Sequence, residues 1–412
     1  MSVRGATRKD QPTNSRVDAA HGLPVAHLPN AHSFATECPT GLTLSVGNAG
    51  DHPSIRALFA QAGYDIPSNE FSMRLDEPFY EPHDRLLARR GMTLAGHVRV
   101  QHRELYLRET VVPATWLVEL AALPEFGGQR LAAHLIAAAE VKMRTEGAAL
   151  GLVRTDTPAL FAQAGWTRWG RFSQTRAGTR ETLAHISGRR MPQSRGAETI
   201  NSPINQPINQ PINSPVNLSV NPPAKPTQLS TRLWRHVEQT ALERIYHANA
   251  IRCVGAPVRT SDYWRWLVSR HAYDAIYVAV SGRDRWSLDG KGIVGYAVVK
   301  NERVLEMLAQ TDRPDALEEL AARVCGEFIE RDRYDLCLEG PHDHSWHHEL
   351  RSSGGRSETS DADCGQVLMA KVFEPTRPLP GHPPHTTLAT LATKQLAAAP
   401  FWLPSWDHRQ CD

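Results

Sequence analysis

Residues 119–136 read ELAALPEFGGQRLAAHLI, and this stretch decides the fold. An apolar run stops at Pro124, two glycines follow, and an alanine-rich stretch with helical spacing begins near Arg130. The pattern predicts a strand, a tight turn and a helix in direct succession. A helix start offers unpaired amide hydrogens and the positive end of the helix dipole, and both suit a phosphate group. The same residues also fit an ordinary strand–turn–helix corner that binds nothing.

The segments on either side of this junction predict a mixed α/β sheet. Strand patterns cover residues 41–47, 84–90, 93–107, 115–123 and 149–155, and helix patterns cover 51–63, 130–147 and 157–165. A similar order of elements follows later in the chain, with helices expected at 233–250, 261–270 and 315–330. Strands are expected there at 273–280, 292–300, 303–310, 334–340 and 367–373. The sequence therefore predicts two α/β units in tandem.

Composition sets limits on what the protein does. The chain has 412 residues and is 41% hydrophobic, which favours two domains. A net charge of +2 gives no electrostatic reason to expect nucleic acid or an anionic membrane as a partner. Six scattered cysteines without a CxxC pair favour reduced thiols, and no apolar run approaches the ~18 residues of a membrane span. A cytoplasmic protein is expected.

The repeat SPINQPINQPINSPVNLSVNPPAKP, residues 202–226, marks the clearest boundary. Its prolines remove amide donors and fix φ, so it reads as a semi-extended linker. The expected order is a disordered leader (1–40), a first domain (41–190), the linker (191–226), a second domain (227–374) and a C-terminal tail (375–412).

The junction resembles the acetyl-coenzyme A motif of the GNAT superfamily of N-acetyltransferases. That motif reads Leu-Ala-Val-x-Pro, two residues, then Arg/Gln-Gly-x-Gly-x-Gly/Ala. The matching positions are Leu120, Ala121, Pro124, Gly128, Leu131 and Ala132. The downstream TPALFAQAGWTRWG resembles the short helix and the strand that end this fold, so the likeness covers about residues 41–175.

The resemblance implies that acetyl-CoA is the co-substrate and that acetyl passes to a primary amine. Strand-end donors would orient the pantetheine arm, and loop amides would hold the pyrophosphate. The implied cofactor-binding residues are Ala121, Ala122, Leu123, Gly127, Gly128, Gln129, Arg130, Leu131 and Ala132. A strand amide near Ala121 is the candidate donor to the thioester oxyanion.

The sequence departs from the family pattern at three positions. Gly127 replaces the usual Arg or Gln, and Arg130 replaces the second glycine, where its side chain either supplies charge or faces solvent. Phe161 stands where many members have a tyrosine as general acid, and phenylalanine has no proton to give. For the general base, Glu119 is the carboxylate nearest in sequence; it is either buried with a raised pKa, or it is satisfied by partners or faces the rim.

The second unit resembles the second, degenerate module of the enhanced-intracellular-survival type of acetyltransferase. The resembling features are Arg259, Tyr263 and Trp264, Gly295 and Tyr296, and the strand end Glu306 to Ala309. No Gly-x-Gly loop follows Ala309, and acidic residues open the next helix, so no coenzyme A is expected there. The sterol-carrier-like domain of that type is not expected either, because only ~40 residues follow the last strand.

Three readings of function remain. The first is an N-acetyltransferase with the second domain walling the acceptor cleft. The second is a tandem-GNAT aminoacyl or acyl-thiol ligase, and the third is a non-catalytic acyl-CoA-binding scaffold, which Phe161 and Arg130 favour. The histidine-rich HDHSWHH, residues 342–348, is read as a solvated loop and not as a metal site. The acceptor and the oligomeric state are not encoded in any recognisable motif.

Overall fold

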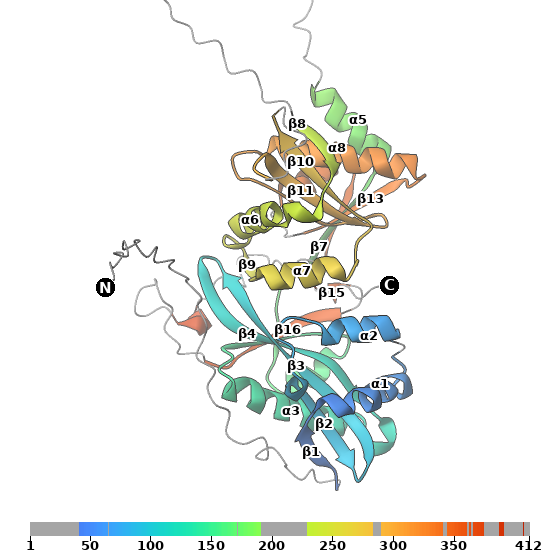
Figure 1. Cartoon of the computed structure of the whole chain (residues 1–412), viewed down its shortest axis with the longest axis vertical. Coiled ribbons are helices and arrows are strands. Elements are labelled where there is room, and N and C mark those ends of the chain that lie inside the picture. Colours follow the sequence, from blue (N-terminus) through green and yellow to red (C-terminus); the bar gives the residue numbers. More distant parts are fainter. Residues whose placement is uncertain are drawn as a thin grey trace, which may run out of the picture.

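Two β-sheets, each covered by helices, lie one above the other along the long axis of the computed structural model (Figure 1). The structure describes residues 41–64, 66–170, 172–190, 229–282, 290–340, 344–360, 362–363, 366–374, 387–390 and 407. The expected leader and linker lie outside these residues, as does nearly all of the expected tail. Within the described residues, no helix has both the length and the apolar character needed to cross a membrane.

The first sheet has nine strands. In spatial order its main path is β1 (Thr43–Val46), β2 (Arg85–Arg90), β3 (Thr93–Leu107), β4 (Thr110–Ala122), β5 (Leu150–Thr155), β16 (Gln366–Val372) and β15 (Ala362–Asp363). β6 (Thr167–Arg168) pairs with β16, and β9 (Val254–Pro257) pairs with β3. The helices are α1 (His52–Gln61), α2 (Ser68–Leu75), α3 (Gln129–Thr145) and α4 (Pro158–Gln163).

Helices cover both faces of this sheet because the strands alternate apolar side chains between two cores. Leu86 of β2 packs with α3 and α4, whereas its neighbour Leu87 packs with α1 and α2. The apolar stripe of α3 includes Leu131, Leu135 and Ala139, all buried against the sheet.

The second sheet has seven strands. Their order is β14 (Arg356–Ser360), β7 (Phe172–Gly178), β13 (Asp335–Gly340), β12 (Arg303–Ala309), β11 (Ile293–Lys300), β10 (Ala275–Ser281) and β8 (Leu229–Leu233). One face packs against α6 (Gln239–Ala250) and α7 (Ser261–Ser269), and the other against α5 (Thr179–Arg190), α8 (Asp315–Glu330) and α9 (Ser345–Ser352). The expected mixed α/β class with two sheet bodies is confirmed.

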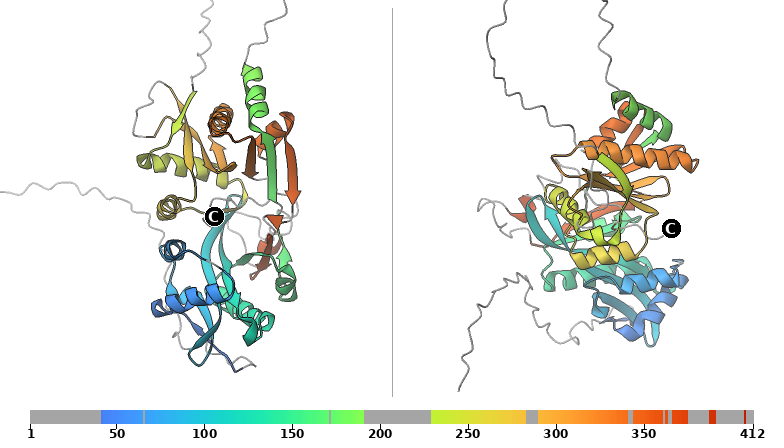
Figure 2. Two further views of the ribbon diagram at one scale, coloured as in Figure 1. Left: turned by 90° about the vertical axis from the view of Figure 1, so that its right-hand side faces the viewer. Right: turned by 45° about the horizontal axis from the view of Figure 1, so that its top comes forward.

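Some strands of each half of the chain belong to the sheet of the other half. The expected domains, residues 41–190 and 227–374, are contiguous and did not include this exchange. β7, from the first span, lies between β13 and β14 of the second sheet, and α5 follows it there. In return β16 pairs from Val367 to Val372 with β5 of the first sheet, and β9 pairs with β3. The red β16 beside the green and cyan strands shows this exchange (Figures 1 and 2). Each sheet is therefore completed by the other half of the chain.

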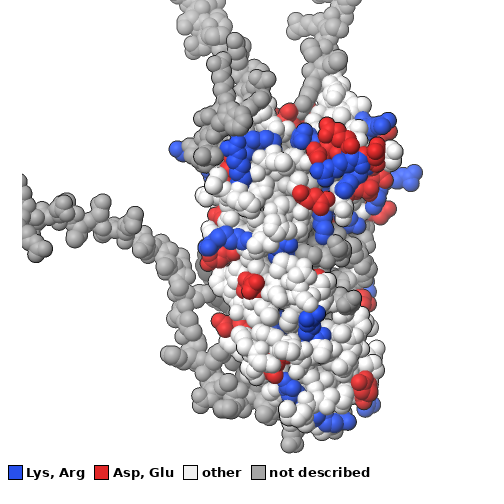
Figure 3. Space-filling view, turned by 45° about the vertical axis from the view of Figure 1, so that its right-hand side comes forward, with Lys and Arg blue, Asp and Glu red and all other residues white. Residues whose placement is uncertain are grey.

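Charges are mixed on the surface. On the face seen in Figure 3, Lys and Arg alternate with Asp and Glu over the second body, and the region below it carries few charges. This face has no large patch of a single sign, in keeping with the near-neutral net charge.

A partly buried ion cluster on the first body is expected to make stability depend on pH. His102 of β3 lies 3.2 Å from Glu146 and 3.6 Å from Asp84. Burial alone would lower the pKa of His102, but hydrogen bonds to the two carboxylates outweigh it and raise the pKa to about 9.

Because the folded pKa lies above the unfolded value near 6.5, this group stabilises the fold fully below pH 6.5. Its contribution is lost as pH rises through about 9. We therefore expect the melting temperature to fall between pH 6.5 and pH 9.5, and His102→Gln to flatten the fall. An equal fall in both proteins, measured by circular dichroism, would contradict this assignment.

Candidate active site

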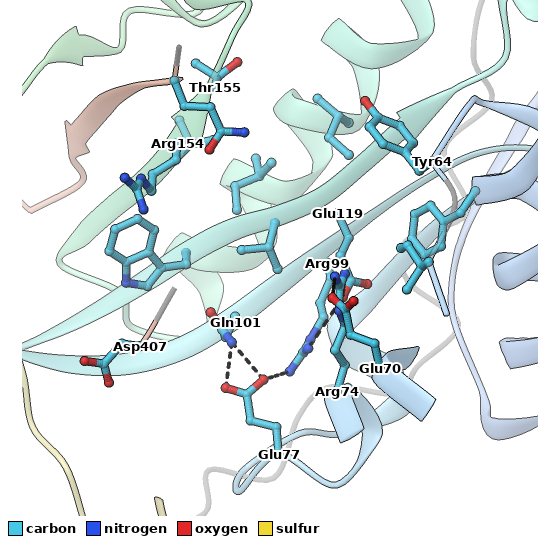
Figure 4. A pocket seen from close by; sticks show the side chains of 18 of the residues that line it. Tyr64, Glu70, Arg74, Glu77, Arg99, Gln101, Glu119, Arg154, Thr155 and Asp407 are labelled. Carbon is cyan, nitrogen blue, oxygen red and sulfur yellow. Dashed lines mark hydrogen bonds and ion pairs between the residues drawn. The ribbon is translucent and has the colours of Figure 1, made fainter. Parts of the chain in front are cut away.

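A cleft opens where two parallel strands of the first sheet separate. β4 and β5 pair only from Ala114 to Trp116, opposite Leu150 to Leu152, and both strands then continue without pairing to each other. The cleft has a volume of about 570 Å³ and is lined by β3, β4, β5, α1, α2 and α4 of the first body. Trp266 and Arg270, and Asp407 near the chain end, complete the wall (Figure 4).

A bulge in β4 shapes the cleft. The register with β3 shifts between His97 and Arg99, so one extra residue of β4 is accommodated there. Glu119 takes up the irregularity with a φ of 57°, in the left-handed region that non-glycine residues seldom occupy. The buried His97 donates from Nδ1 to the Glu119 carbonyl at 2.9 Å and holds this conformation.

The Glu119 side chain is held by arginines. Its carboxylate lies 2.6 Å from Arg85 and 3.3 Å from Arg74, with Arg99 at 3.9 Å. Burial would raise the pKa of Glu119, but the positive charges of Arg85, Arg99 and Arg74 outweigh it and hold the pKa well below its usual range. Of the two alternatives left open by the sequence, a carboxylate with a raised pKa and one satisfied by partners, the structure favours the second. A carboxylate so strongly ionised is a poor acceptor for an ammonium proton.

We expect Glu119→Gln to destabilise the protein and leave the pH dependence of turnover near neutrality unchanged. The substitution leaves the fully buried Arg85 without its counter-charge, which costs about 3–5 kcal/mol. That loss corresponds to a fall in melting temperature of about 10 °C. Glu125→Gln, at an exposed residue of the following turn, is the control. If Glu119→Gln removed activity with an unchanged melting temperature, the catalytic reading would be restored.

A second carboxylate, Glu77, is paired just as fully. It accepts from Arg99 at 2.6 Å and from Gln101 at 2.6 and 2.8 Å (Figure 4). It also contacts Arg103. Arg99 and Gln101 stand on β3, two residues apart, so their side chains emerge on the same face of the sheet. This cluster forms one wall of the cleft.

The turn before α3 has the backbone that the sequence predicts. Gly127 has a φ of 99° and Gly128 a φ of 40°, values that favour glycine. The amides are not equally available, however. Those of Gly127 and Gly128 donate to Pro124 and Leu123, and those of Arg130 and Ala132 donate to Gly127 and Gly128. Within the described residues, only the Gln129 and Leu131 amides of this set find no backbone acceptor.

The amides at the end of β4 also differ in availability, because some point toward β3 and others toward the open side of the strand. The Leu123 amide donates to Ala95 of β3, so it is not available to a ligand in the cleft. Because amides alternate along an antiparallel strand, that of Ala121 points to β3 as well, and those of Leu120 and Ala122 point to the open side. Of the strand amides near Ala121, those of Leu120 and Ala122 therefore remain as candidates for the expected oxyanion donor.

Phe161 lines the cleft from α4 and packs edge-on against Trp166, with ring centroids 5.7 Å apart. It is 2% exposed and belongs to the apolar core. The only tyrosine among the described lining residues is Tyr64, after α1, whose side chain is half exposed. No single motif marks Tyr64 in the sequence, because its place depends on how α1 packs.

The second body contributes its wall through specific contacts. The Trp266 indole of α7 donates to the Met73 carbonyl of α2 at 2.8 Å, which joins the two bodies at the cleft. Asp407 is bound by the buried Arg259 at 2.5 and 3.1 Å, and Arg270 donates to the Asp407 carbonyl at 3.4 Å. Arg270 and Asp407 lie far from the cofactor motif in sequence, and no motif pointed to either of them.

The corresponding strand end of the second body is already occupied by side chains. Asn249 donates to the Ala309 carbonyl and His344 donates to the Met307 carbonyl, each at 2.9 Å. The helix that follows, α8, opens with Asp315, which is ion-paired to Arg313. The second body thus lacks a glycine turn and carries negative charge where the first body presents amides.

The histidine-rich segment lies partly outside the described residues, at His342 and Asp343. Its described part is not the solvated loop that the sequence suggested, because His344 caps helix α9 and the helix packs on the second sheet. His347 is buried there and bonded through Nδ1 to Thr175 at 2.8 Å. Among the described residues, no three His, Cys, Asp or Glu side chains are grouped as a metal site would require.

Comparison with known proteins agrees with this geometry. Residues 47–168 match the family model for the acetyltransferase (GNAT) domain. The chain contains a GNAT acetyltransferase domain. On the basis of this match we class the protein as an acyltransferase enzyme. No curated protein matches the sequence.

Solved structures of GNAT proteins share the fold over most of this chain. A GCN5-related N-acetyltransferase from Anabaena variabilis superposes with a TM-score of 0.55 at 11% identity, covering 80% of this chain and 72% of its own. A probable N-acyltransferase from Enterococcus faecalis gives 0.56 at 10% identity, with the same coverage. A GCN5-related N-acetyltransferase from Kribbella flavida gives 0.55 at 11% identity, covering 81% and 71%. At these identities the likeness concerns the fold alone.

Proposed function

We propose that the protein transfers an acetyl group from acetyl-CoA to a primary amine in the cytoplasm, with the cleft beside β4 as the active site. The observation that carries the proposal is the separation of β4 from β5 directly before the glycine turn and α3. The enhanced-intracellular-survival type remains our prediction for the subfamily.

The α3 start is the proposed diphosphate site. The Gln129 and Leu131 amides and the positive end of the 17-residue helix α3 would face the anion. Arg130 is exposed and makes no ion pair among the described residues, so it is free to add a positive charge. Gly127 and Gly128 would let the backbone approach the phosphates, and Ala132 would keep the first turn narrow.

The pantetheine arm and the thioester would follow the open edge of β4. The Ala122 and Leu120 amides are the proposed donors, the latter to the carbonyl oxygen as it becomes negative. The amine nitrogen, once deprotonated, attacks the carbonyl carbon. The C–N bond forms, the C–S bond breaks, and the thiolate takes up a proton to leave as free CoA thiol. The proton lost by the ammonium leaves through water, because Glu119 is held ionised by its arginines.

Acetyl transfer is tested by release of free thiol from acetyl-CoA with the full chain and a panel of primary amines. We expect amine-dependent thiol release above the rate without amine. One observation favours a second function, a non-catalytic acyl-CoA sensor: Phe161 is buried in the core and offers no acid. Tight binding of acetyl-CoA without thiol release for any amine would favour that sensor. Release only with a larger thioester or an aminoacyl donor would favour an acyl ligase.

A further inference from the structure

The charges that line the cleft are almost all neutralised within the protein. Five carboxylates line it, Glu70, Glu77, Glu119, Asp156 and Asp407, beside the guanidinium groups of Arg74, Arg99, Arg154 and Arg270. Three further arginines, Arg85, Arg103 and Arg259, bond to lining carboxylates from outside the cleft. The cleft is therefore rich in charge but has little net field.

The pairing is specific. Glu119 binds Arg85 at 2.6 Å, and Glu77 binds Arg99 at 2.6 Å. Asp407 binds Arg259 at 2.5 Å. Glu70 pairs with Arg74 one turn along α2. These carboxylates already have cationic partners, and a bound ammonium group would have to compete with a guanidinium for each of them.

One lining carboxylate differs from the rest. Asp156 follows the last residue of β5, is exposed, and makes no ion pair or hydrogen bond with any described residue. It lies beyond the point where β5 has separated from β4. An ammonium group entering the cleft can reach this carboxylate without displacing an arginine.

The remaining walls are largely apolar and aromatic. Phe59, Trp116, Phe161 and Trp266 are buried side chains that line the cleft, and Tyr64 stands half exposed beside them. Trp266 is fixed in place by its bond to the Met73 carbonyl. Aromatic walls of this kind suit a ligand with an aromatic or branched aliphatic body.

We infer that the acetyl acceptor is a monoamine with an apolar body, whose single ammonium group is bound by Asp156. The inference rests on the proposed function of the same cleft. A polycation such as a polyamine brings further ammonium groups, and among the described lining residues these would find no second unpaired carboxylate. An ammonium group that loses its water without gaining a counter-charge opposes binding strongly.

The test compares 2-phenylethylamine with spermidine on the full chain. Turnover is read as thiol release, and binding of each amine to the CoA-loaded protein is read by calorimetry. We expect kcat/KM and affinity to favour 2-phenylethylamine by about tenfold or more, since burying an ammonium group without a counter-charge costs several kcal/mol. Preference for spermidine in either readout would overturn the inference.

Asp156→Asn isolates the carboxylate, and Asp76→Asn, at an exposed aspartate outside the cleft, is the matched control. Because the ion pair between Asp156 and the ammonium group would be exposed to solvent, the effect of its loss should be modest. In Asp156→Asn the KM for 2-phenylethylamine should rise about fivefold, and the KM for acetyl-CoA should not change. Equal effects of the two substitutions on the amine KM would contradict the role of Asp156.

Failure of the proposed function has a different signature. If acetyl-CoA binds but no amine is acetylated, acetyl transfer is refuted. The calorimetric comparison of the two amines, and of Asp156→Asn with Asp76→Asn, then still supports or overturns the monoamine inference.

Discussion

Residues 41–190, expressed without the rest of the chain, are expected to remain unfolded. The fragment lacks β16, so β5 would expose the edge that now pairs with Val367 to Val372. Leu368 and Met369 are fully buried in the first sheet, and Val367 nearly so. Burial of each large apolar side chain contributes about 1.5–3 kcal/mol, so losing them removes a large part of a typical 5–15 kcal/mol stability. The fragment also carries β7 and α5, whose partners lie in the second sheet.

A rearranged chain tests whether the missing β16 is the reason that the fragment stays unfolded. Residues 41–170 joined by a flexible glycine–serine linker to residues 361–374 restore the neighbour of β5 and omit β7. This chain should melt cooperatively by circular dichroism, and the same chain with residues 361–374 in scrambled order should not. Cooperative melting of the plain 41–190 fragment near the temperature of the full protein would contradict the strand exchange.

Gly128→Ala should weaken acetyl-CoA binding about ten- to a hundredfold, since forcing a residue with a Cβ into this backbone costs about 1–3 kcal/mol. The cause is conformational and not steric. Gly128 has φ 40° and ψ −105°, and the nearest atom to an added Cβ is Pro124 Cα at 3.6 Å. The loop would relax by changing its backbone, which turns the amides at the start of α3 away from the phosphates.

Gly147→Ala is the matched control for this substitution. Gly147 follows the other end of α3, has a φ of 80°, and has no atom within 4 Å of an added Cβ. The Gly147→Ala protein should lose a similar amount of stability through backbone strain and should keep its affinity for acetyl-CoA. If both substitutions weakened binding equally in calorimetry, the loop at Gly128 would not be the diphosphate site.

The junction could be predicted from the sequence because its signals are local. A proline, two glycines and the helical spacing of Leu131 and Leu135 are enough to place the turn and α3, which begins at Gln129. The expected stripe also included Val141, which is exposed. Which amides remain unpaired was not predictable, since that depends on the backbone angles of Gly127 and Gly128.

The partners of Glu119 were beyond sequence reasoning. Its neighbours in the chain, Val118 and Leu120, indicate burial, and burial alone raises the pKa of a carboxyl group. The decisive charges come from Arg74, Arg85 and Arg99, on α2, β2 and β3, and only the folded sheet brings them together.

The strand exchange was not predictable for the same reason, because it depends on contacts between residues far apart in the sequence. Residues 367–373 are predicted as a strand, and β16 is found at Gln366–Val372, but nothing in an apolar strand specifies which sheet edge it joins. β5 and β13 both offer an edge to a further strand, and the choice between β7 and β16 depends on the packing of both bodies. The position of Asp407 in the cleft was also not predictable, because its partner Arg259 lies 148 residues away in the sequence.

Calorimetric titration of the purified full chain with acetyl-CoA tests the central claim most directly. The proposed function predicts saturable binding of one acetyl-CoA per chain, with a dissociation constant of about 1 μM to 1 mM, the usual range for enzyme substrates. Absence of binding heat at millimolar acetyl-CoA, at two temperatures, would contradict it.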